Sequence, residues 1–199
     1  MAGQDDISTR WRIVRRLFHA ALSIAVLYYW FPEVIIELDM GKWVVLLAGG
    51  IIVLCIEVPR LILGKQLPWG RPYELRRPAS YAYAAFGAIL VLLFFPPAIG
   101  APAIASMAWA DPVAGELRRK RLSRSSIGIA CGAVYLAIAL PLMALLDPGS
   151  WFVLPIALAM TITAVISENL GLKYLDDDFV MMVLPAIVGY ILHSLLLSV

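Results

Sequence analysis

Asp111 and the basic residues that follow it form the most distinctive polar segment of the chain. In the stretch ADPVAGELRRKR, Asp111 lies near the end of an apolar run and is followed by Arg118, Arg119, Lys120 and Arg121. A carboxylate can hold a divalent cation, and guanidinium groups bind phosphate oxygens. Because phosphoryl transfer depends on positioning and charge neutralisation, this pairing points to that reaction. An aspartate that only caps the helix end is the alternative.

A predicted helix start directly after the basic run is a second candidate for phosphate binding. Arg124, Ser125, Ser126 and Gly128 open the next apolar run. Helix amino termini present free N–H groups and a partial positive charge, which favour phosphate. Serines are also common at ordinary helix starts. This segment therefore indicates phosphate binding only in combination with the basic run.

Ionisable residues also interrupt the first two apolar runs. Arg15, Arg16 and His19 share one helix face, because they stand at positions i, i+1 and i+4. An ionisable residue at membrane depth costs free energy unless it meets a partner or water, so His19 is a functional candidate. Anchoring at the lipid headgroups is the alternative for all three. Glu57 and Arg60 form either an ion pair or part of a site wall.

Acidic residues cluster between the last two apolar runs. Glu168 ends the sixth run, and Asp176, Asp177 and Asp178 precede the seventh. Three adjacent acids at a membrane surface repel one another, and Mg²⁺ or the basic loops would relieve that repulsion. A solvated loop is the alternative. His193, near the end of the chain, is interpreted as an interfacial packing residue without partners.

The composition predicts a membrane domain that positions these residues. The 199 residues are 62% hydrophobic and 15% charged, with a mean hydropathy of +0.86, whereas soluble domains carry about 25% charged residues. This balance argues against a soluble enzyme. Apolar runs of spanning length cover residues 13–32, 42–63, 79–97, 98–116, 126–146, 150–168 and 179–198. The sequence therefore predicts one all-α domain over residues 1–199, a multi-pass integral membrane bundle of about seven transmembrane helices.

The distribution of charge predicts the orientation of this bundle. With the N-terminus in the cytoplasm, 15 of the 16 Lys and Arg residues, Arg71 and Lys173 among them, fall on the cytoplasmic side and only Lys42 falls outside. Basic residues in short loops favour the cytoplasm. Ten of the 14 acids, including Asp5 and Asp6, fall on the same side. We therefore expect a polar site on the cytoplasmic face.

The motifs that soluble enzymes use for nucleotides are missing from the sequence. It contains no G-x-x-x-x-G-K-[ST], no G-x-G-x-x-G and no nucleophile elbow. Cys55 and Cys131 lie inside apolar runs without metal-ligand spacing, and are predicted to be packing residues. Any nucleotide chemistry must therefore use a membrane-embedded site of another kind.

Taken in order, the polar segments resemble those of the CTP-dependent lipid-alcohol kinases. This family comprises dolichol and polyprenol kinases, phytol kinase and the yeast-type diacylglycerol kinase, distant relatives of CDP-diacylglycerol synthase. The matching segments, within about residues 15–190, are RRLFH, EVPR, RPYELRRPASYAYAAFG, ADPVAGELRRKR, RSSIG and ISENLGLKYLDDDFVMMVLP. Three positions depart from the family pattern: Ala110 replaces glycine, Ile127 replaces glutamate and Asp178 replaces the usual asparagine.

The resemblance implies a reaction and a set of site residues. CTP, with Mg²⁺, would phosphorylate a membrane lipid alcohol of the polyprenol or dolichol type at the cytoplasmic face, giving lipid phosphate and CDP; ATP is the alternative donor. We assign Asp111, Asp177 and Asp178 to the metal, and Asp111, Asp177 and His19 to catalysis. Nucleotide binding is assigned to Arg118, Arg119, Lys120, Arg121, Arg124, Ser125, Ser126 and Gly128. The inner wall is assigned to Arg16, Glu57, Arg60, Glu74, Arg77 and Glu168.

Two other functions compete with this expectation. A cytidylyltransferase resembling CDP-diacylglycerol synthase would use the same nucleotide and release pyrophosphate, but its K-D and D-R-x-D signature is missing here. A lipid transporter or scaffold is the non-enzymatic alternative, although transporters carry ionisable residues near the membrane midplane. The expected partners are CTP, a lipid alcohol and the lipid bilayer, and no nucleic acid. The oligomeric state stays open.

Overall fold

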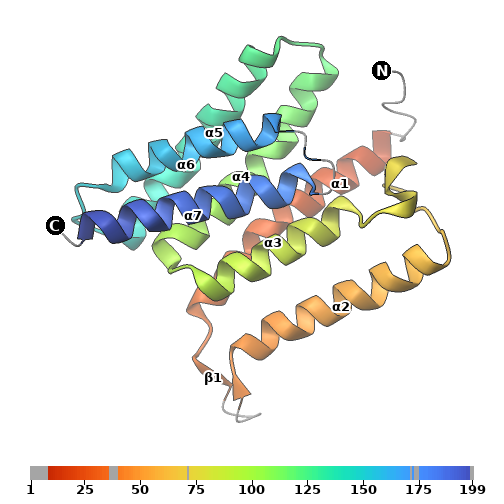
Figure 1. Ribbon diagram of the computed structural model, residues 1–199, viewed down its shortest axis with the longest axis horizontal. Helices are drawn as coiled ribbons and strands as arrows, with labels where there is room; N and C mark the ends of the chain where they lie inside the picture. The colour runs from red at the N-terminus through yellow and green to blue at the C-terminus, as the bar shows by residue number, and fades with distance from the viewer. Residues whose placement is uncertain (1–8, 36–39, 71, 171, 173–174, 198–199) are drawn as a thin grey trace.

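The computed structural model describes residues 9–35, 40–70, 72–170, 172 and 175–197 (Figure 1). The charges counted above at Asp5, Asp6, Arg71 and Lys173 lie outside these residues. Within the described residues the protein has seven α-helices, two 3₁₀ helices and one short two-stranded hairpin. The prediction of an all-α protein is confirmed.

The helices follow one another with short connections. Helix α1 (Thr9–Leu22) continues directly into the 3₁₀ helix η1 (Ser23–Trp30). Strands β1 (Val34–Ile35) and β2 (Met40–Gly41) pair in an antiparallel hairpin before helix α2. The remaining elements in chain order are α2 (Trp43–Ile62), η2 (Pro72–Arg76), α3 (Ser80–Phe94), α4 (Pro97–Arg119), α5 (Arg124–Leu146), α6 (Val153–Asn169) and α7 (Asp177–Leu197).

Each predicted apolar run overlaps one of these α-helices, with ends that differ by a few residues, and the first run also differs in form. The sequence predicted a single helix over residues 13–32, but the α-helical part ends at Leu22 and a 3₁₀ helix follows. The Ser23 hydroxyl donates a hydrogen bond to the Ala20 carbonyl at 2.5 Å. Such a bond back to the preceding turn is typical of serine, and 3₁₀ turns are frequent at helix ends. The first run is therefore narrower and more tightly wound beyond Leu22.

Three of the described helices are long and apolar enough to cross a membrane. They are α2, α5 and residues 177–196 of α7, and most of each lies on the outside of the protein. Helices α3 and α6 are apolar but have only 15 and 17 residues. These three candidate spans indicate a multi-pass membrane protein. Seven spans and a cytoplasmic N-terminus stay predictions.

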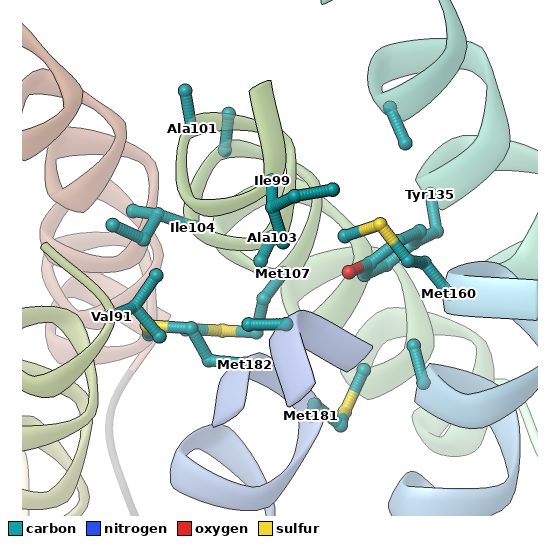
Figure 2. Packing of buried hydrophobic residues seen from close by; sticks show 14 of the residues in the cluster. Val91, Ile99, Ala101, Ala103, Ile104, Met107, Tyr135, Met160, Met181 and Met182 are labelled. Atoms are coloured by element: carbon teal, nitrogen blue, oxygen red, sulfur yellow. The ribbon is translucent and has the colours of Figure 1, made fainter. Parts of the chain in front are cut away.

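Helix α4 is the central element of the core, because α1, η1, α3, α5 and α7 all pack against it (Figure 1). Its buried face is rich in alanine between Ala98 and Ala114, and small side chains let neighbouring helices approach closely. Larger side chains fill the centre, as Figure 2 shows for Ile99, Ile104, Met107, Tyr135, Met160, Met181 and Met182. This packing sets the position of α4, and with it the position of Asp111.

Two expectations about single residues can be compared with the structure directly. His193 Nε2 lies 3.2 Å from Asp147 Oδ2, so the expectation that His193 has no partner is wrong. The contact links α7 to the C-terminal end of α5. The two residues are 46 positions apart, so the sequence pattern did not indicate the contact. Cys55 and Cys131 are both free thiols; Cys131 is buried in the core, whereas Cys55 is exposed on α2.

Candidate functional site

Three ionisable side chains from three helices meet near one end of the bundle. His19 belongs to α1, Asp111 to α4 and Asp178 to the first turn of α7. His19 Nε2 lies 3.9 Å from Asp111 Oδ2 and 3.6 Å from Asp178 Oδ2. One ligand atom of each residue lies within 4.8 Å of the others. We name these three residues the His-Asp-Asp group.

The His-Asp-Asp group is largely shielded from its surroundings. His19 is 6% exposed and Asp178 is 2% exposed, and the Asp111 side chain is 16% exposed. Burial of two carboxylates together costs free energy unless a cation or hydrogen bonds compensate it. Donor atoms this close together can share a single divalent ion. Oxygen donors with one histidine therefore fit a metal site.

Local sequence explains why each member of the group faces inward. His19 follows Arg15 by one helical turn, and Arg15 donates to Ser80 at 3.3 Å, so this face of α1 points toward α3. The Asp178 amide donates to Asp176 Oδ1 at 3.2 Å, which caps the start of α7. Asp111 lies inside α4, eight residues before Arg119. The helix-cap alternative for Asp111 therefore does not apply.

Arg118 connects the group to helix α6. Its Nη2 atom lies 2.9 Å from Glu168 Oε1 and 3.7 Å from Asp111 Oδ1. The Glu168 side chain is 5% exposed, but the Arg118 side chain is 35% exposed. Cys131 of α5 lies in the electrostatic environment of Glu168, Asp111 and Arg118. Arg118 therefore reaches from the surface to the buried carboxylates, where it could also contact a phosphate.

The remaining basic residues lie outside this group. Glu116 pairs with both Arg16 and Arg119, which links the middle of α1 to the end of α4. Five residues predicted to bind the nucleotide, in the turn before α5 and at its start, are exposed: Lys120, Arg121, Arg124, Ser125 and Ser126. Gly128 is partly buried. An exposed basic surface next to Arg118 is accessible to a soluble nucleotide.

The start of α5 is stabilised by its own sequence. The Ser123 hydroxyl accepts a hydrogen bond from the Ser126 amide at 3.1 Å and caps the helix. A methyl group added at Gly128 would lie 3.3 Å from Val165 Cγ1 of α6. Gly128 therefore has a packing role, because it lets α5 approach α6 closely.

Glu57 and Arg60 form a buried ion pair with further partners. Arg60 Nε donates to Glu57 Oε2 at 2.9 Å, and Arg60 Nη2 donates to Glu57 Oε1 at 2.6 Å. Arg60 also donates to the carbonyls of Glu74 and Arg77 at 2.9 and 2.6 Å. Glu57 accepts from the Ala79 amide at 2.7 Å. Of the two interpretations of this pair, the structure shows the ion pair, and it ties α2 to the segment before α3.

Ser80 connects this segment with the ends of α1 and α7. Its hydroxyl oxygen lies 3.2 Å from Glu74 Oε1 and 3.0 Å from Asp176 Oδ2. Glu74 is buried, at 4% exposed. Glu74 was predicted to belong to the wall, whereas Ser80 gave no signal in the sequence, because a lone serine at a helix start is common. These contacts hold the segment around Glu74 and Ser80 next to the His-Asp-Asp group.

The structure separates the two aspartates that the sequence analysis treated alike. Asp178 belongs to the His-Asp-Asp group, whereas Asp177, its neighbour in the first turn of α7, lies outside the group. Adjacent residues on a helix point in directions about 100° apart, so only one of them can face a given site. The position that faces the site depends on the rotation of α7.

Comparison of the chain with protein-family models, curated proteins and solved structures found no match. The functional interpretation therefore depends on the site geometry, together with the resemblance of short segments described above. The described residues form an all-α protein with three candidate membrane spans and a largely buried His-Asp-Asp group beside a basic surface.

Proposed function

We propose that the protein is a Mg²⁺-dependent lipid-alcohol kinase that uses CTP as phosphoryl donor. The convergence of His19, Asp111 and Asp178, with Arg118 at its edge, is the observation that carries this proposal. Mg²⁺ in phosphoryl-transfer sites is held by one or two carboxylates together with substrate phosphates. Asp111 and Asp178 supply such a pair, and the resemblance to lipid-alcohol kinases supports the choice of reaction.

Each residue of the site has a task in this reaction. Asp111 and Asp178 would hold Mg²⁺, which neutralises charge on the transferred phosphoryl group. Arg118 binds phosphate oxygens, and the exposed basic residues from Arg119 to Arg124 attract the nucleotide. Glu57 and Arg60 act at a distance, because they position the segment that carries Glu74. Asp177 contributes charge next to the site.

The transfer itself needs a proton acceptor. The lipid hydroxyl oxygen forms a bond to the γ-phosphorus, the bond from that phosphorus to the bridging oxygen breaks, and CDP leaves. The hydroxyl proton goes to His19 Nε2, the atom that faces both carboxylates at 3.6 and 3.9 Å. A positioned histidine is the most frequent general base in proteins. This assigns the base to His19 and leaves the carboxylates free for the metal.

The product of the reaction tests this proposal. Purified protein in liposomes, incubated with γ-labelled CTP, Mg²⁺ and a panel of lipid alcohols, is expected to form labelled lipid phosphate and CDP. Labelled ATP gives the nucleotide preference, and EDTA should abolish turnover.

Two outcomes would contradict the kinase proposal. Pyrophosphate together with a CDP-lipid would identify a cytidylyltransferase. No product from any acceptor, with the protein folded and Mn²⁺ still bound at the site, would favour a lipid transporter or scaffold.

A further inference from the structure

A cavity of about 190 Å³ lies next to the His-Asp-Asp group. It is enclosed by one face of α1, by the start of α3 and by the segment between α2 and α3. Its lining residues are Arg15, Phe18, His19, Leu22, Trp69, Glu74, Ala79, Ser80, Tyr81 and Ala84. His19 belongs to both the cavity and the His-Asp-Asp group, so a molecule in the cavity can contact the group through His19.

The lining of the cavity changes from polar to apolar along the two helices. Helices α1 and α3 begin at the same end of the bundle (Figure 1), as the contact between Arg15 and Ser80 also shows. Leu22 lies seven residues beyond Arg15, which places it about 10 Å further along α1. Ala84 lies one turn beyond Ser80 on α3. The cavity is therefore polar near the helix starts and apolar further along them.

One side of the cavity, at Phe18 and Trp69, reaches the outer surface of the bundle. Phe18 lines the cavity but is 57% exposed. Its ring lies 5.9 Å from the ring of Trp69, which in turn lies 5.7 Å from that of Trp11. Aromatic rings on a membrane protein favour the interface between water and lipid. A lipid could therefore enter between these rings from the bilayer.

We propose that this cavity binds the hydroxyl end of a single-chain lipid alcohol, which enters from the bilayer beside α1. This inference rests on the proposed kinase function and adds the place and class of the acceptor. The polar end, with Ser80 and Glu74, accommodates the hydroxyl group next to His19. The apolar end, with Leu22 and Ala84, accommodates the first carbons of the chain, and the rest of the chain stays in the bilayer.

The size of the cavity favours a single chain over a diacylglycerol. About 190 Å³ is less than the roughly 300–1,000 Å³ typical of sites that enclose a whole small molecule. A diacylglycerol carries two ester groups and two chains close to its hydroxyl, and these need both room and hydrogen-bond partners. A prenyl alcohol carries one chain and no ester group beside its hydroxyl, so it needs less room and fewer hydrogen-bond partners.

Substitutions that fill the cavity test this inference. Leu22→Trp fills it from α1 and Ala84→Leu fills it from α3. Leu17→Trp is the matched control, because Leu17 is on the same helix but is 63% exposed and does not line the cavity. For a prenyl alcohol, both filling variants are expected to raise the apparent KM about tenfold or more without changing the KM for CTP, while the control behaves as the native protein.

Photolabelling provides a measurement that does not need turnover. A prenyl alcohol with a diazirine near its hydroxyl is expected to label α1 and α3 in the native protein. That labelling should fall in folded Leu22→Trp or Ala84→Leu protein, persist in Leu17→Trp, and resist competition by excess diacylglycerol. Thermal unfolding in detergent identifies a filling variant that has failed to fold. The other filling variant then shows whether filling the cavity reduces labelling.

The outcomes separate this inference from the kinase proposal. Labelling of α1 and α3 without phosphorylation by the native protein would support lipid binding in the cavity and contradict the proposed kinase function. Two results would contradict lipid binding in the cavity and still support the kinase function. One is phosphorylation with labelling only outside α1 and α3, and the other is phosphorylation with an unchanged KM in folded filling variants. Efficient competition by diacylglycerol would overturn the single-chain assignment.

Discussion

Asp177 and Asp178 are adjacent in the chain, yet their surroundings in the folded protein differ. Asp178 Oδ2 lies 3.6 Å from His19 Nε2, and Asp178 is one of the three residues whose ligand atoms converge. Asp177 shares the first turn of α7 but not that convergence. Under the proposed kinase function, the position of Asp178 is one where the resemblance expects asparagine. An amide oxygen can still ligate a metal ion, whereas a methyl group cannot.

Substitutions at these two positions therefore test the metal assignment. Asp178→Ala is expected to lower kcat about 100-fold or more, since it removes a charged group placed for the transition state. Asp178→Asn keeps an oxygen ligand and should retain activity within about tenfold of the native protein. Asp177→Ala should have the smaller effect of the two alanine variants. Turnover and Mn²⁺ binding by electron paramagnetic resonance are the measurements.

The control for these variants is the stability of the protein. All three should unfold within a few degrees of the native protein in the same detergent, so that lost turnover reflects the site. A larger defect in Asp177→Ala than in Asp178→Ala would overturn the assignment of Asp178 to the metal and return that role to Asp177.

At the scale of the elements, η1 is held to the junction between α3 and α4 by one side chain. The Tyr29 hydroxyl lies 3.0 Å from the Phe95 carbonyl and 3.3 Å from the Val91 carbonyl. Carbonyls at the end of a helix such as α3 lack partners within the helix, so Tyr29 satisfies one of them. Gly100 of α4 makes room for this contact, because a methyl group there would overlap the Tyr29 hydroxyl.

Gly100→Ala is therefore expected to destabilise the protein by about 1–3 kcal/mol, the usual cost of overpacking a core. Gly49→Ala is the matched control, because a methyl group at Gly49 of α2 would meet nothing within 4 Å. That control should be neutral or stabilise by about 0.5–1 kcal/mol, since alanine favours the helix over glycine. Thermal unfolding in detergent measures both. Equal unfolding temperatures for the two variants would contradict the packing role of Gly100.

At the scale of the whole molecule, most of the ion pairs among the described residues lie at one end of the bundle, whereas the His193–Asp147 pair lies at the other. The middle of α1 contacts the end of α4 through Arg16 and Glu116, and Arg118 reaches Glu168 at the end of α6. Ser80 at the start of α3 reaches Asp176 just before α7. These segments are the ones that the distribution of Lys and Arg predicts to be cytoplasmic.

Cysteine labelling of intact cells tests this orientation. In a Cys55→Ala background, a membrane-impermeant maleimide is expected to label Pro148→Cys, at an exposed position between α5 and α6, from outside. Lys120→Cys, between α4 and α5, should react only after the membrane is permeabilised. Helix α5 separates the two positions and is long enough to span a bilayer. The reverse pattern of labelling would place the His-Asp-Asp group on the outer side, where CTP is not available.

Sequence patterns were sufficient to predict where the helices lie, but not the 3₁₀ form of η1 or the partner of His193. Apolar runs bounded by proline and polar residues predicted each helix, because run length and helix breakers are local properties. Pro96 and Pro97 correctly separated α3 from α4. The 3₁₀ form of η1 was not predicted, because it depends on hydrogen bonds that composition does not encode. The partner of His193 was missed for a similar reason: Asp147 lies 46 residues earlier.

An all-α protein rich in long apolar helices, with its ionisable residues in a few segments, could be predicted from the sequence alone. Hydrophobic length and charge placement are properties of a chain before it folds, so no tertiary contact was needed to infer them. Only the tertiary structure decided that His19, Asp111 and Asp178 converge, that Glu57 and Arg60 form an ion pair, and that a cavity adjoins the group. These features depend on the rotation and close packing of helices distant in sequence, which the interlocking of many side chains sets together.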